Sequence, residues 1–289
     1  MWVLLALASA FFAGIMSILA KVGLKNTDSN LATALRTVVV VFFAWTMVFV
    51  VGSHTTLTTI DIKSIIFLVL SGFATGGAWL CYFKALKTGD VNKVVPIDKS
   101  SIILTMLLSM SFLGEGFTII KVCAMVFIGT GTYLKIERKQ IGSDESKGHK
   151  WLFYAVLAAV FSSLTAILGK IGIEGVESNL GTAIRTIVVL CMAWVIVLIQ
   201  GKHKEIKNID NKSWVFLGLS GLATGLSWLC FYSALQQGPV SVVLPIDKLS
   251  VLVTIAFSFF ILKEKLKKLP AIGLLLIVIG TLSLLIKTG

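Results

Sequence analysis

Residues 71–86 read SGFATGGAWLCYFKAL, and residues 220–235 repeat them as SGLATGLSWLCFYSAL. Two further pairs keep the same spacing: SNLATALRTVVV at 29–40 returns as SNLGTAIRTIVV at 178–189, and VVPIDKSS at 94–101 returns as VLPIDKLS at 243–250. The offset is 149 residues each time, as 185 − 36, 228 − 79 and 247 − 98 show. The chain therefore consists of two copies of one unit, which we place at residues 1–141 and 151–289, with a linker at 142–150.

The composition is that of a membrane protein. Hydrophobic residues make up 56% of the chain and charged residues 14%, whereas soluble domains carry about 25% charged residues. The apolar residues gather in runs of about 20, long enough for a helix to cross the hydrocarbon of a bilayer. Ten such segments are expected: Trp2–Leu24, Asn30–Gly52, Ile65–Leu86, Lys93–Leu113, Phe117–Ile136, Trp151–Ile173, Asn179–Gly201, Trp214–Gln236, Ser241–Leu262 and Lys268–Ile286.

These segments predict an all-α membrane protein with ten transmembrane helices in two five-helix repeats. A helix satisfies its own backbone in lipid, and runs of this length are too long for the strands of a membrane barrel. Because each repeat crosses the membrane an odd number of times, the second repeat must be inverted relative to the first. Inverted repeats are a recurring basis of alternating-access transport.

The distribution of Lys and Arg predicts the orientation. Of the 26 basic residues, eighteen lie near one predicted membrane face, four near the face that holds the N-terminus, and four within helices. Basic residues accumulate on the cytoplasmic side of membrane proteins. We therefore expect a multi-pass protein of the plasma membrane with both termini outside and the linker in the cytoplasm. The +12 net charge is explained by this pattern, so we expect no nucleic-acid partner.

Ionisable residues inside the apolar segments form two matched sets. A charge at the centre of a spanning helix costs at least ~3 kcal/mol on insertion scales, so such residues commonly mark a substrate route. We expect a cluster near each membrane face: Lys21, Arg36 and Asp98 with Lys84 near the cytoplasmic face, and Lys170, Arg185 and Asp247 near the outer face.

Three interpretations of these clusters remain open at the level of sequence. They form a gate or a polar path to a central site, or structural Arg–Asp clamps, or they include lysines that extend to the interface, as suits Lys21 and Lys170. Since neighbouring residues on a helix lie about 100° apart, the adjacent Asp–Lys pairs cannot both face inward. We expect Asp98 and Asp247 to face the interior.

Two other repeated features are candidates for the substrate site. Pro96 and Pro245 precede the two aspartates and predict a helix break, or a proline in the first helical turn. Aromatic residues recur at matched positions and could line a substrate pocket or form an interfacial belt: Trp45, Trp79, Tyr82, Trp194, Trp228 and Tyr232. Gly72-x-x-x-Gly76 and Gly221-x-x-x-Gly225 predict close helix packing. Glu115 and Glu264 fall at segment ends, where we expect them to be solvated.

The remaining residues argue against an enzyme. The three histidines lie in loops without ligand spacing, the four cysteines lie inside apolar segments, and no phosphate-binding loop is present. We therefore predict no catalytic residues, no metal and no cofactor.

Taken together, the chain resembles the EamA-type members of the drug/metabolite transporter superfamily. The resemblance covers the two five-helix repeats, Arg36 and Arg185 early in the second helix of each, the aromatic and small residues of the third, and Glu115 and Glu264 at the end of the fourth. It implies a carrier of small metabolites in the bacterial plasma membrane. The small four-helix relatives carry a glutamate in their first helix, but Trp2–Leu24 and Trp151–Ile173 contain no carboxylate, which argues against their mechanism of cation export.

We therefore expect a secondary-active carrier of a neutral, zwitterionic or anionic organic solute, such as an amino acid or organic acid. Proton coupling would run through Asp98 and Asp247, the carboxylates inside the apolar segments. The alternatives are a flippase of a lipid-linked head group and a passive channel. The expected partners are a small-molecule substrate, the lipid bilayer and protons, and the chain would act as a monomer or homodimer.

Overall fold

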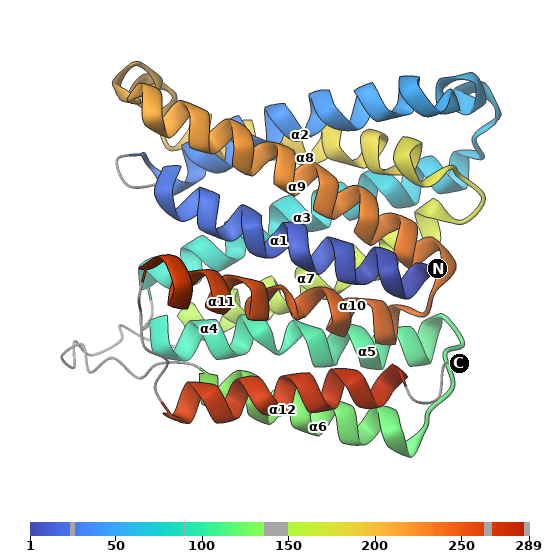
Figure 1. Cartoon of the computed structure of the whole chain (residues 1–289). Coiled ribbons are helices and arrows are strands. Elements are labelled where there is room, and N and C mark those ends of the chain that lie inside the picture. The colour runs from blue at the N-terminus through green and yellow to red at the C-terminus, as the bar shows by residue number, and fades with distance from the viewer. Residues whose placement is uncertain (24–26, 89–90, 136–149, 263–267, 286–289) are drawn as a thin grey trace.

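A computed structural model describes residues 1–23, 27–88, 91–135, 150–262 and 268–285. These residues form α-helices with two short 3-10 helices, and no strand occurs among them (Figure 1). Of the predicted linker 142–150, residues 142–149 lie outside the described residues, as does Glu264, and Lys150 begins α7. The helices are α1 (Trp2–Gly23), α2 (Ser29–Val51), α3 (Ile62–Thr88), α4 (Val91–Lys99), α5 (Ser101–Phe112), α6 (Ile119–Lys135), α7 (Lys150–Ile173), α8 (Ser178–Ile199), α9 (Asn211–Gln237), α10 (Val240–Lys248), α11 (Ser250–Leu262) and α12 (Lys268–Leu285).

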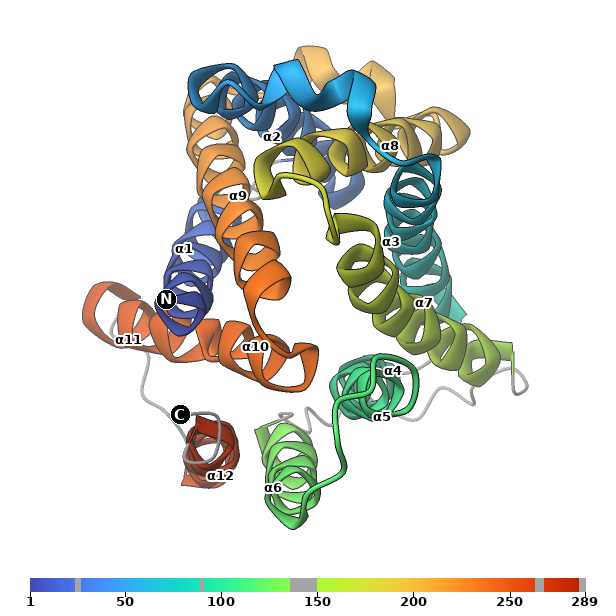
Figure 2. The ribbon, with the colours of Figure 1, turned by 90° about the vertical axis from the view of Figure 1, so that its right-hand side faces the viewer.

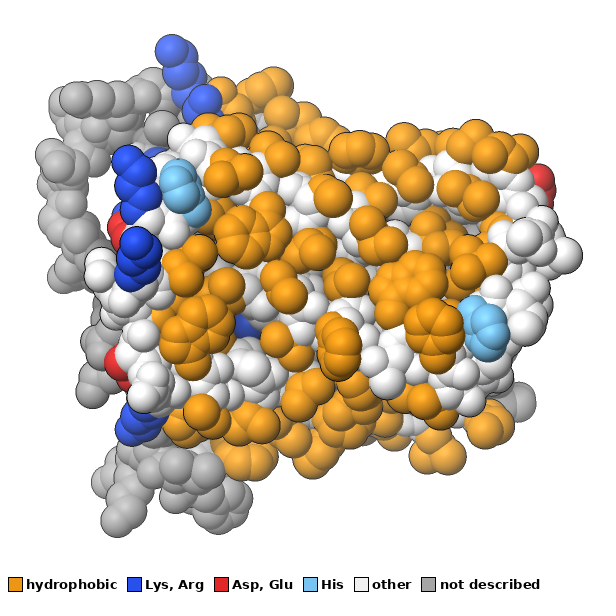
Figure 3. All heavy atoms as spheres, turned by 90° about the horizontal axis from the view of Figure 1, so that it is seen from above, with side chains coloured by type: hydrophobic (Ala, Val, Ile, Leu, Met, Phe, Trp, Pro, Cys, Tyr) orange, Lys and Arg blue, Asp and Glu red, His pale blue; other side chains and the backbone are white. Residues whose placement is uncertain are grey.

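Length and composition suit these helices to a membrane. Within the described residues, eight helical stretches are long and apolar enough to cross a bilayer, and α6 and α12 are shorter apolar helices. Each predicted apolar segment is helical, and the fourth and ninth are each divided in two, as α4 with α5 and α10 with α11. Hydrophobic side chains cover the middle of the face in Figure 3, while Lys and Arg gather at one end of it. The chain is therefore a multi-pass membrane protein.

The second helix of each half begins and ends with the same chemistry. Asp28 accepts backbone N–H bonds from Asn30 and Leu31 at the start of α2, and Glu177 accepts them from Asn179 and Leu180 at the start of α8. A carboxylate there satisfies free N–H groups and complements the helix dipole. After the helices, Gly52 and Gly201 take a left-handed conformation with φ of 80° and 68°, which glycine adopts without steric cost.

The two halves interleave rather than sit side by side. The first helix of each half packs on the third helix of the other, α1 on α9 and α7 on α3, and the equivalent pairs α2–α8 and α6–α12 also meet (Figure 2). Each first helix also contacts the divided helix of the other half, α1 with α10 and α11, and α7 with α4 and α5. The main contacts between the halves therefore have counterparts under exchange of the repeats, whereas α5 packs on α10 with no contact of similar extent between α11 and α4 among the described residues.

The paired glycines explain how closely these helices approach. A Cβ added at Gly72 of α3 would lie 2.6 Å from Val188 Cβ of α8, and one at Gly221 of α9 would lie 2.7 Å from Val39 Cβ of α2. Real Cβ atoms do not approach so closely, so only glycine fits. The prediction of tight packing through these glycines is confirmed.

The ends of the bundle differ in charge. In Figure 1 the start of α1, the end of α9, the start of α10 and the end of α12 lie at one end of the molecule. The loop between α8 and α9, which carries Lys202, Lys204 and Lys207, lies at the other end, where Figure 3 shows the basic side chains. We call these the N-terminal end and the basic end.

Candidate functional site

Arg185 on α8 is the most deeply buried charge among the described residues, with 2% of its surface exposed. Its Nε donates to Ser71 Oγ at 3.0 Å, and its Nη2 donates to Thr75 Oγ1 at 2.6 Å. Both hydroxyls come from α3, in the other half of the chain. No ion pair holds this guanidinium among the described residues, and its Nη1 is buried there without a hydrogen-bond partner.

Two aromatic rings from α9 cover the same guanidinium. Its central carbon lies 4.8 Å from the centre of the Tyr232 ring and 5.2 Å from that of Trp228. A cation over an aromatic face gains about 0.5–2 kcal/mol, more when desolvated. Gly169 of α7 provides the space for Tyr232, because a Cβ there would lie 2.8 Å from the ring. Three helices besides its own therefore enclose the charge of Arg185.

Hydroxyl groups extend this cluster to α7. Ser71 Oγ donates to the Thr165 carbonyl at 2.7 Å, and Thr75 Oγ1 lies 3.3 Å from Thr165 Oγ1. Thr75 Oγ1 also lies 3.0 Å from the Ser71 carbonyl. The site thus consists of one cation and a set of neutral hydroxyls, an arrangement that leaves the positive charge uncompensated.

Arg36 occupies the matching position on α2 but has different surroundings. It is half-buried, and its Nε has no hydrogen-bond partner among the described residues. The counterparts of Ser71 and Thr75 make the matching bonds to carbonyls, from Ser220 Oγ to Met16 at 3.2 Å and from Thr224 Oγ1 to Ser220 at 2.7 Å. Among the described residues, however, no hydrogen bond joins Arg36 to either hydroxyl. The two arginines are equivalent in sequence and unlike in structure.

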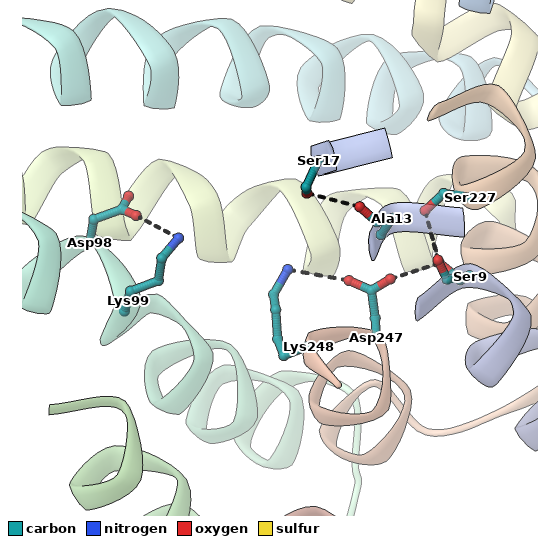
Figure 4. A network of polar contacts seen from close by, with 8 residues as sticks. All are labelled: Ser9, Ala13, Ser17, Asp98, Lys99, Ser227, Asp247 and Lys248. Atoms are coloured by element: carbon teal, nitrogen blue, oxygen red, sulfur yellow. Dashed lines mark hydrogen bonds and ion pairs between the residues drawn. The ribbon is translucent and has the colours of Figure 1, made fainter. Parts of the chain in front are cut away.

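A second polar group joins the two halves at Asp247 (Figure 4). Ser9 of α1 donates from its Oγ to Asp247 Oδ1 of α10 at 2.7 Å, and Ser9 Oγ lies 3.2 Å from Ser227 Oγ of α9. Lys248 Nζ lies 3.3 Å from Asp247 Oδ2. Asp247 is thus joined to α1 of the other half by a hydrogen bond and to the lysine that follows it by an ion pair.

The aspartates are the inward members of both Asp–Lys pairs. The side chains of Asp98 and Asp247 are 16% and 13% exposed, against 53% and 44% for Lys99 and Lys248. Each lysine turns back to the aspartate before it, with 3.4 Å between Lys99 Nζ and Asp98 Oδ2 (Figure 4).

The helix breaks lie one turn beyond the two prolines. Pro96 and Pro245 are inside α4 and α10, and the helices are interrupted at Ser100 and Leu249. Proline removes a backbone donor from the helix that contains it, which weakens the turn where the aspartates lie. A shallow pocket beside the first break is lined by Pro96, Lys99, Ser100, Ile102, Ile103, Ile128, Gly129, Thr132 and Tyr133.

Lys170 ties the N-terminal end of the bundle together. Its ammonium donates to the Leu235 carbonyl, to that of Gln236 at 3.3 Å and to that of Gly238 at 3.1 Å. These carbonyls end α9, where the helix dipole favours a cation. Gln236 Nε2 in turn donates to the carbonyls of Ile173 at 3.0 Å and Val176 at 2.6 Å, so the ends of α7 and α9 hold each other.

Glu115 closes the same end from the first half. Its carboxylate accepts the backbone N–H groups of Val240 and Ser241 at the start of α10, and lies 3.8 Å from Lys121 Nζ. The side chain is 10% exposed. The expectation of a solvated Glu115 was wrong. The free N–H groups at the start of α10 and the helix dipole stabilise the carboxylate there, so it lies against the helix and not in water.

Among the described residues, the expected ion pairs between the two arginines and the two aspartates do not form. Lys170 binds the carbonyls of α9, Arg185 binds hydroxyls of α3, and Asp247 binds Ser9. Within the described residues Asp98 pairs with Lys99 and not with Arg36. Lys84 lies 5.0 Å from the Tyr154 ring centre, and Lys21 is in the last turn of α1. Equal depth was taken as contact, whereas Lys170 donates to carbonyls of α9 and Arg185 donates to hydroxyls of α3.

The structure divides the predicted aromatic pocket. Trp228 and Tyr232 meet at Arg185, but the other four members pack into apolar clusters. Trp79 and Trp194 contact one cluster that includes Leu31 and Val197, Trp45 contacts another with Val48 and Leu180, and Tyr82 contacts a third with Ala85 and Ala155.

The comparisons with known proteins agree with this architecture. The model of the EamA-like transporter family matches residues 1–136 and again 149–286. The chain belongs to the EamA-like transporter family. An uncharacterized transporter in the cobO 3' region of Sinorhizobium sp. is 41% identical over 134 residues, which are 46% of this chain and 95% of that protein. The transporter YxxF of Bacillus subtilis, also uncharacterized, is 26% identical over 167 residues, 57% of this chain and 52% of that protein.

A solved crystal structure shares the fold of this family member. It superposes with a TM-score of 0.77 at 16% identity and covers 99% of this chain and 96% of its own. At that identity the likeness concerns the fold alone. The match to the EamA-like transporter family, and not this likeness, makes the chain a membrane transporter.

The sequence analysis missed the hydroxyl residues Ser71, Thr75, Thr165, Ser9 and Ser227. A signal was present for two of them, because Ser71 and Thr75 recur as Ser220 and Thr224 in the longest repeated stretch. Hydroxyls in membrane helices also bond to their own backbone, so their repetition alone did not reveal a binding role.

Proposed function

We propose that the chain is a secondary-active carrier that moves a small neutral, zwitterionic or anionic organic solute by alternating access. In this proposal ten helices span the bacterial plasma membrane as two inverted five-helix repeats, with both termini outside. The observation that carries it is the interleaved packing, in which the first, second, third and last helices of each half meet the other half in matching pairs under exchange of the repeats. Two halves built this way can exchange conformations, and that exchange moves a central site between the two faces.

The half-length relatives support the five-helix unit. The Sinorhizobium protein and an uncharacterized protein of Methanocaldococcus jannaschii are each matched by 134 residues of this chain over 95% and 94% of their length. Each relative is thus about as long as one repeat. When two such units are joined in one chain, the Lys and Arg residues in the loops of each unit determine how that unit is oriented in the membrane.

The bonds at the N-terminal end suit an outer gate. Glu115, Lys170 and Gln236 hold the ends of α7, α9 and α10 through backbone groups. Hydrogen bonds to charged groups contribute about 1.5–3 kcal/mol each. A few such bonds can favour one conformation and still be broken when the carrier changes conformation. We propose that these three residues separate when the carrier opens outward.

Proton coupling is proposed for the inward-facing aspartates. Asp247 binds Ser9 of α1, so a change in its charge alters a contact between the halves. Asp98 occupies the matching position on α4. A proton on either carboxylate removes a buried negative charge, which changes the relative free energy of two packed arrangements.

Transport in proteoliposomes tests the proposal. Purified protein should exchange a labelled metabolite by counterflow at a saturable rate, and an inward proton gradient should drive uptake. We expect Asp98→Asn and Asp247→Asn to abolish the pH-driven part while counterflow persists. Flux that does not saturate would indicate a channel, activity restricted to lipid-linked head groups would indicate a flippase, and unchanged pH dependence would exclude the aspartates as coupling sites.

A further inference from the structure

Arg185 is a buried charge for which the protein supplies no counter-charge. It is 2% exposed, and among the described residues its polar partners are the hydroxyls of Ser71 and Thr75. Removing an ion from water costs several kcal/mol even after relaxation of the protein. A structural cation in a membrane helix is normally paired, so the missing partner points to a ligand.

The guanidinium has one edge in use and one edge free. Its Nε and Nη2 form the edge that faces Ser71 and Thr75, at 3.0 and 2.6 Å. Nη1 and the second N–H of Nη2 form the adjacent edge, and within the described residues Nη1 is buried without a hydrogen-bond partner. Two parallel N–H groups on one edge match the two oxygens of a carboxylate.

The surroundings specify more than charge. The ring centres of Trp228 and Tyr232 lie 5.2 and 4.8 Å from the central carbon of the guanidinium, so aromatic surface lies beside the cation. Tyr232 is fully buried, and Gly169 provides the space for its ring. The described helices enclose the site in this structure.

We propose that Arg185 binds the carboxylate of the transported solute, with the aromatic rings of Trp228 and Tyr232 packing against the apolar part of that solute. This inference rests on the proposed function and narrows its substrate class to organic carboxylates, amino acids included. The ligand supplies the negative charge that the protein lacks, and Ser71 and Thr75 keep the arginine oriented while the site is empty.

Thermal unfolding of the purified protein in detergent tests the inference. The probes are propanoate, succinate, 3-phenylpropanoate and phenylalanine, each compared with its amide. We expect at least one carboxylate to raise the unfolding midpoint of the wild type in a saturable manner, since a ligand that binds the folded state stabilises it, and its amide to have no such effect. Equal effects of acid and amide, or no response to any carboxylate, would overturn the assignment.

Variants locate the site. In Arg185→Gln the carboxylate should bind about tenfold or more weakly, the effect of losing a hydrogen bond to a charged group. Arg185→Lys keeps the positive charge but loses the two parallel N–H groups of the guanidinium, so it should weaken carboxylate binding similarly. If Arg185→Gln does not fold, Arg185→Lys provides the test. Lys204→Gln, which removes one exposed charge at the basic end, is the matched control and should bind like the wild type. Wild-type affinity in both arginine variants would place the carboxylate elsewhere and overturn the inference.

The same preparations separate this inference from the proposed function. Saturable counterflow of a neutral solute, with no response to carboxylates, would leave the carrier intact and refute the role of Arg185. Absence of saturable exchange for every solute, with carboxylate binding retained, would refute the carrier and leave the site.

Discussion

Arg36 and Arg185 stand at equivalent places in two nearly identical stretches, yet one is half-buried and the other is enclosed. Arg185 donates to Ser71 and Thr75, whereas no such bond joins Arg36 to Ser220 or Thr224 among the described residues, although all four hydroxyls make matching bonds to carbonyls. The ring of Tyr232 lies over Arg185, and its counterpart in the repeat is Phe83. The two environments therefore differ partly in sequence, at Tyr232 and Phe83, and partly in how the two halves are arranged.

The glycine contacts, by contrast, are the same in both halves. Gly72 meets Val188 and Gly221 meets Val39 at nearly equal distances. The molecule thus combines a scaffold that is symmetric between its halves with a polar interior that is not. In a carrier of the proposed kind, the scaffold persists through the cycle and the surroundings of the two arginines are exchanged.

The largest effect is expected from breaking the scaffold. Gly72→Val and Gly221→Val should each prevent folding, because even the Cβ atom would approach the opposite helix within 2.6 or 2.7 Å, and overpacking costs at least ~1–3 kcal/mol. Size-exclusion chromatography of the detergent-solubilised protein measures this as loss of the monodisperse peak. Gly218→Ala is the control, since that position of α9 meets nothing within 4 Å. Failure of only one valine variant would show that the two packings differ.

A smaller effect should separate the two arginine sites. Thr75→Val removes the acceptor of a buried guanidinium, and we expect it to lower the free energy of unfolding by about 1.5–3 kcal/mol. Thr224→Val is the matched change in the other half, where the hydroxyl binds a carbonyl of its own helix, and should cost about 1 kcal/mol or less. Unfolding midpoints in detergent compare the two. Equal losses would contradict the described asymmetry.

A third test concerns the N-terminal end. Glu115→Gln keeps the shape of the side chain and removes the charge that binds two N–H groups and Lys121. We expect this end to open more often, so that a cysteine at position 241 reacts about three- to tenfold faster with a membrane-impermeant thiol reagent, the change for about 0.7–1.4 kcal/mol. The labelled protein carries Ser241→Cys, and its four native cysteines are replaced so that the reagent reacts only at position 241. An unchanged rate would remove Glu115 from the gate.

The smallest effect is expected at the basic end. The hydrogen bond that Lys202 donates to Glu205 raises the pKa of Lys202, and the negative charges of Glu205 and Asp28 add to this effect. A raised pKa means that the stabilisation is complete below the ordinary lysine pKa and is lost as pH rises through the higher folded value. Because such exposed pairs contribute little, Lys202→Met should leave the unfolding midpoint unchanged at pH 7. A clear shift at that pH would show that this pair restrains α2 and α8.

Much of the fold could be predicted from the sequence because lipid imposes simple rules. Continuous apolar runs defined the helices, and the spacing of Gly72 and Gly76 defined a packing face. The helices that this face would meet could not be predicted, since every apolar helix offers similar surfaces to its neighbours. The position of Lys170 indicated depth but not partner, and the carbonyls at the end of α9 become available only once α9 ends beside α7.

The hydroxyl partners of Arg185 were unpredictable for a related reason. Ser71 and Thr75 lie on α3, more than a hundred residues earlier in the chain. A hydroxyl in a helix can always bond to the preceding turn, so no local pattern distinguishes one that binds a distant charge. The sequence repeat identifies the positions of Ser71 and Thr75, and only the packing of α3 against α8 shows that these hydroxyls accept hydrogen bonds from Arg185.

The packing of α1 on α9 also has a consequence for synthesis. Ser9 and Ser227 meet across 218 residues, and translation proceeds at about 5–20 residues per second. The first helix must therefore wait in the membrane for roughly 10–40 seconds before its main neighbour emerges. Throughout that interval its small and polar face is uncovered, which makes the nascent first half a substrate for membrane chaperones or proteases until the later half arrives.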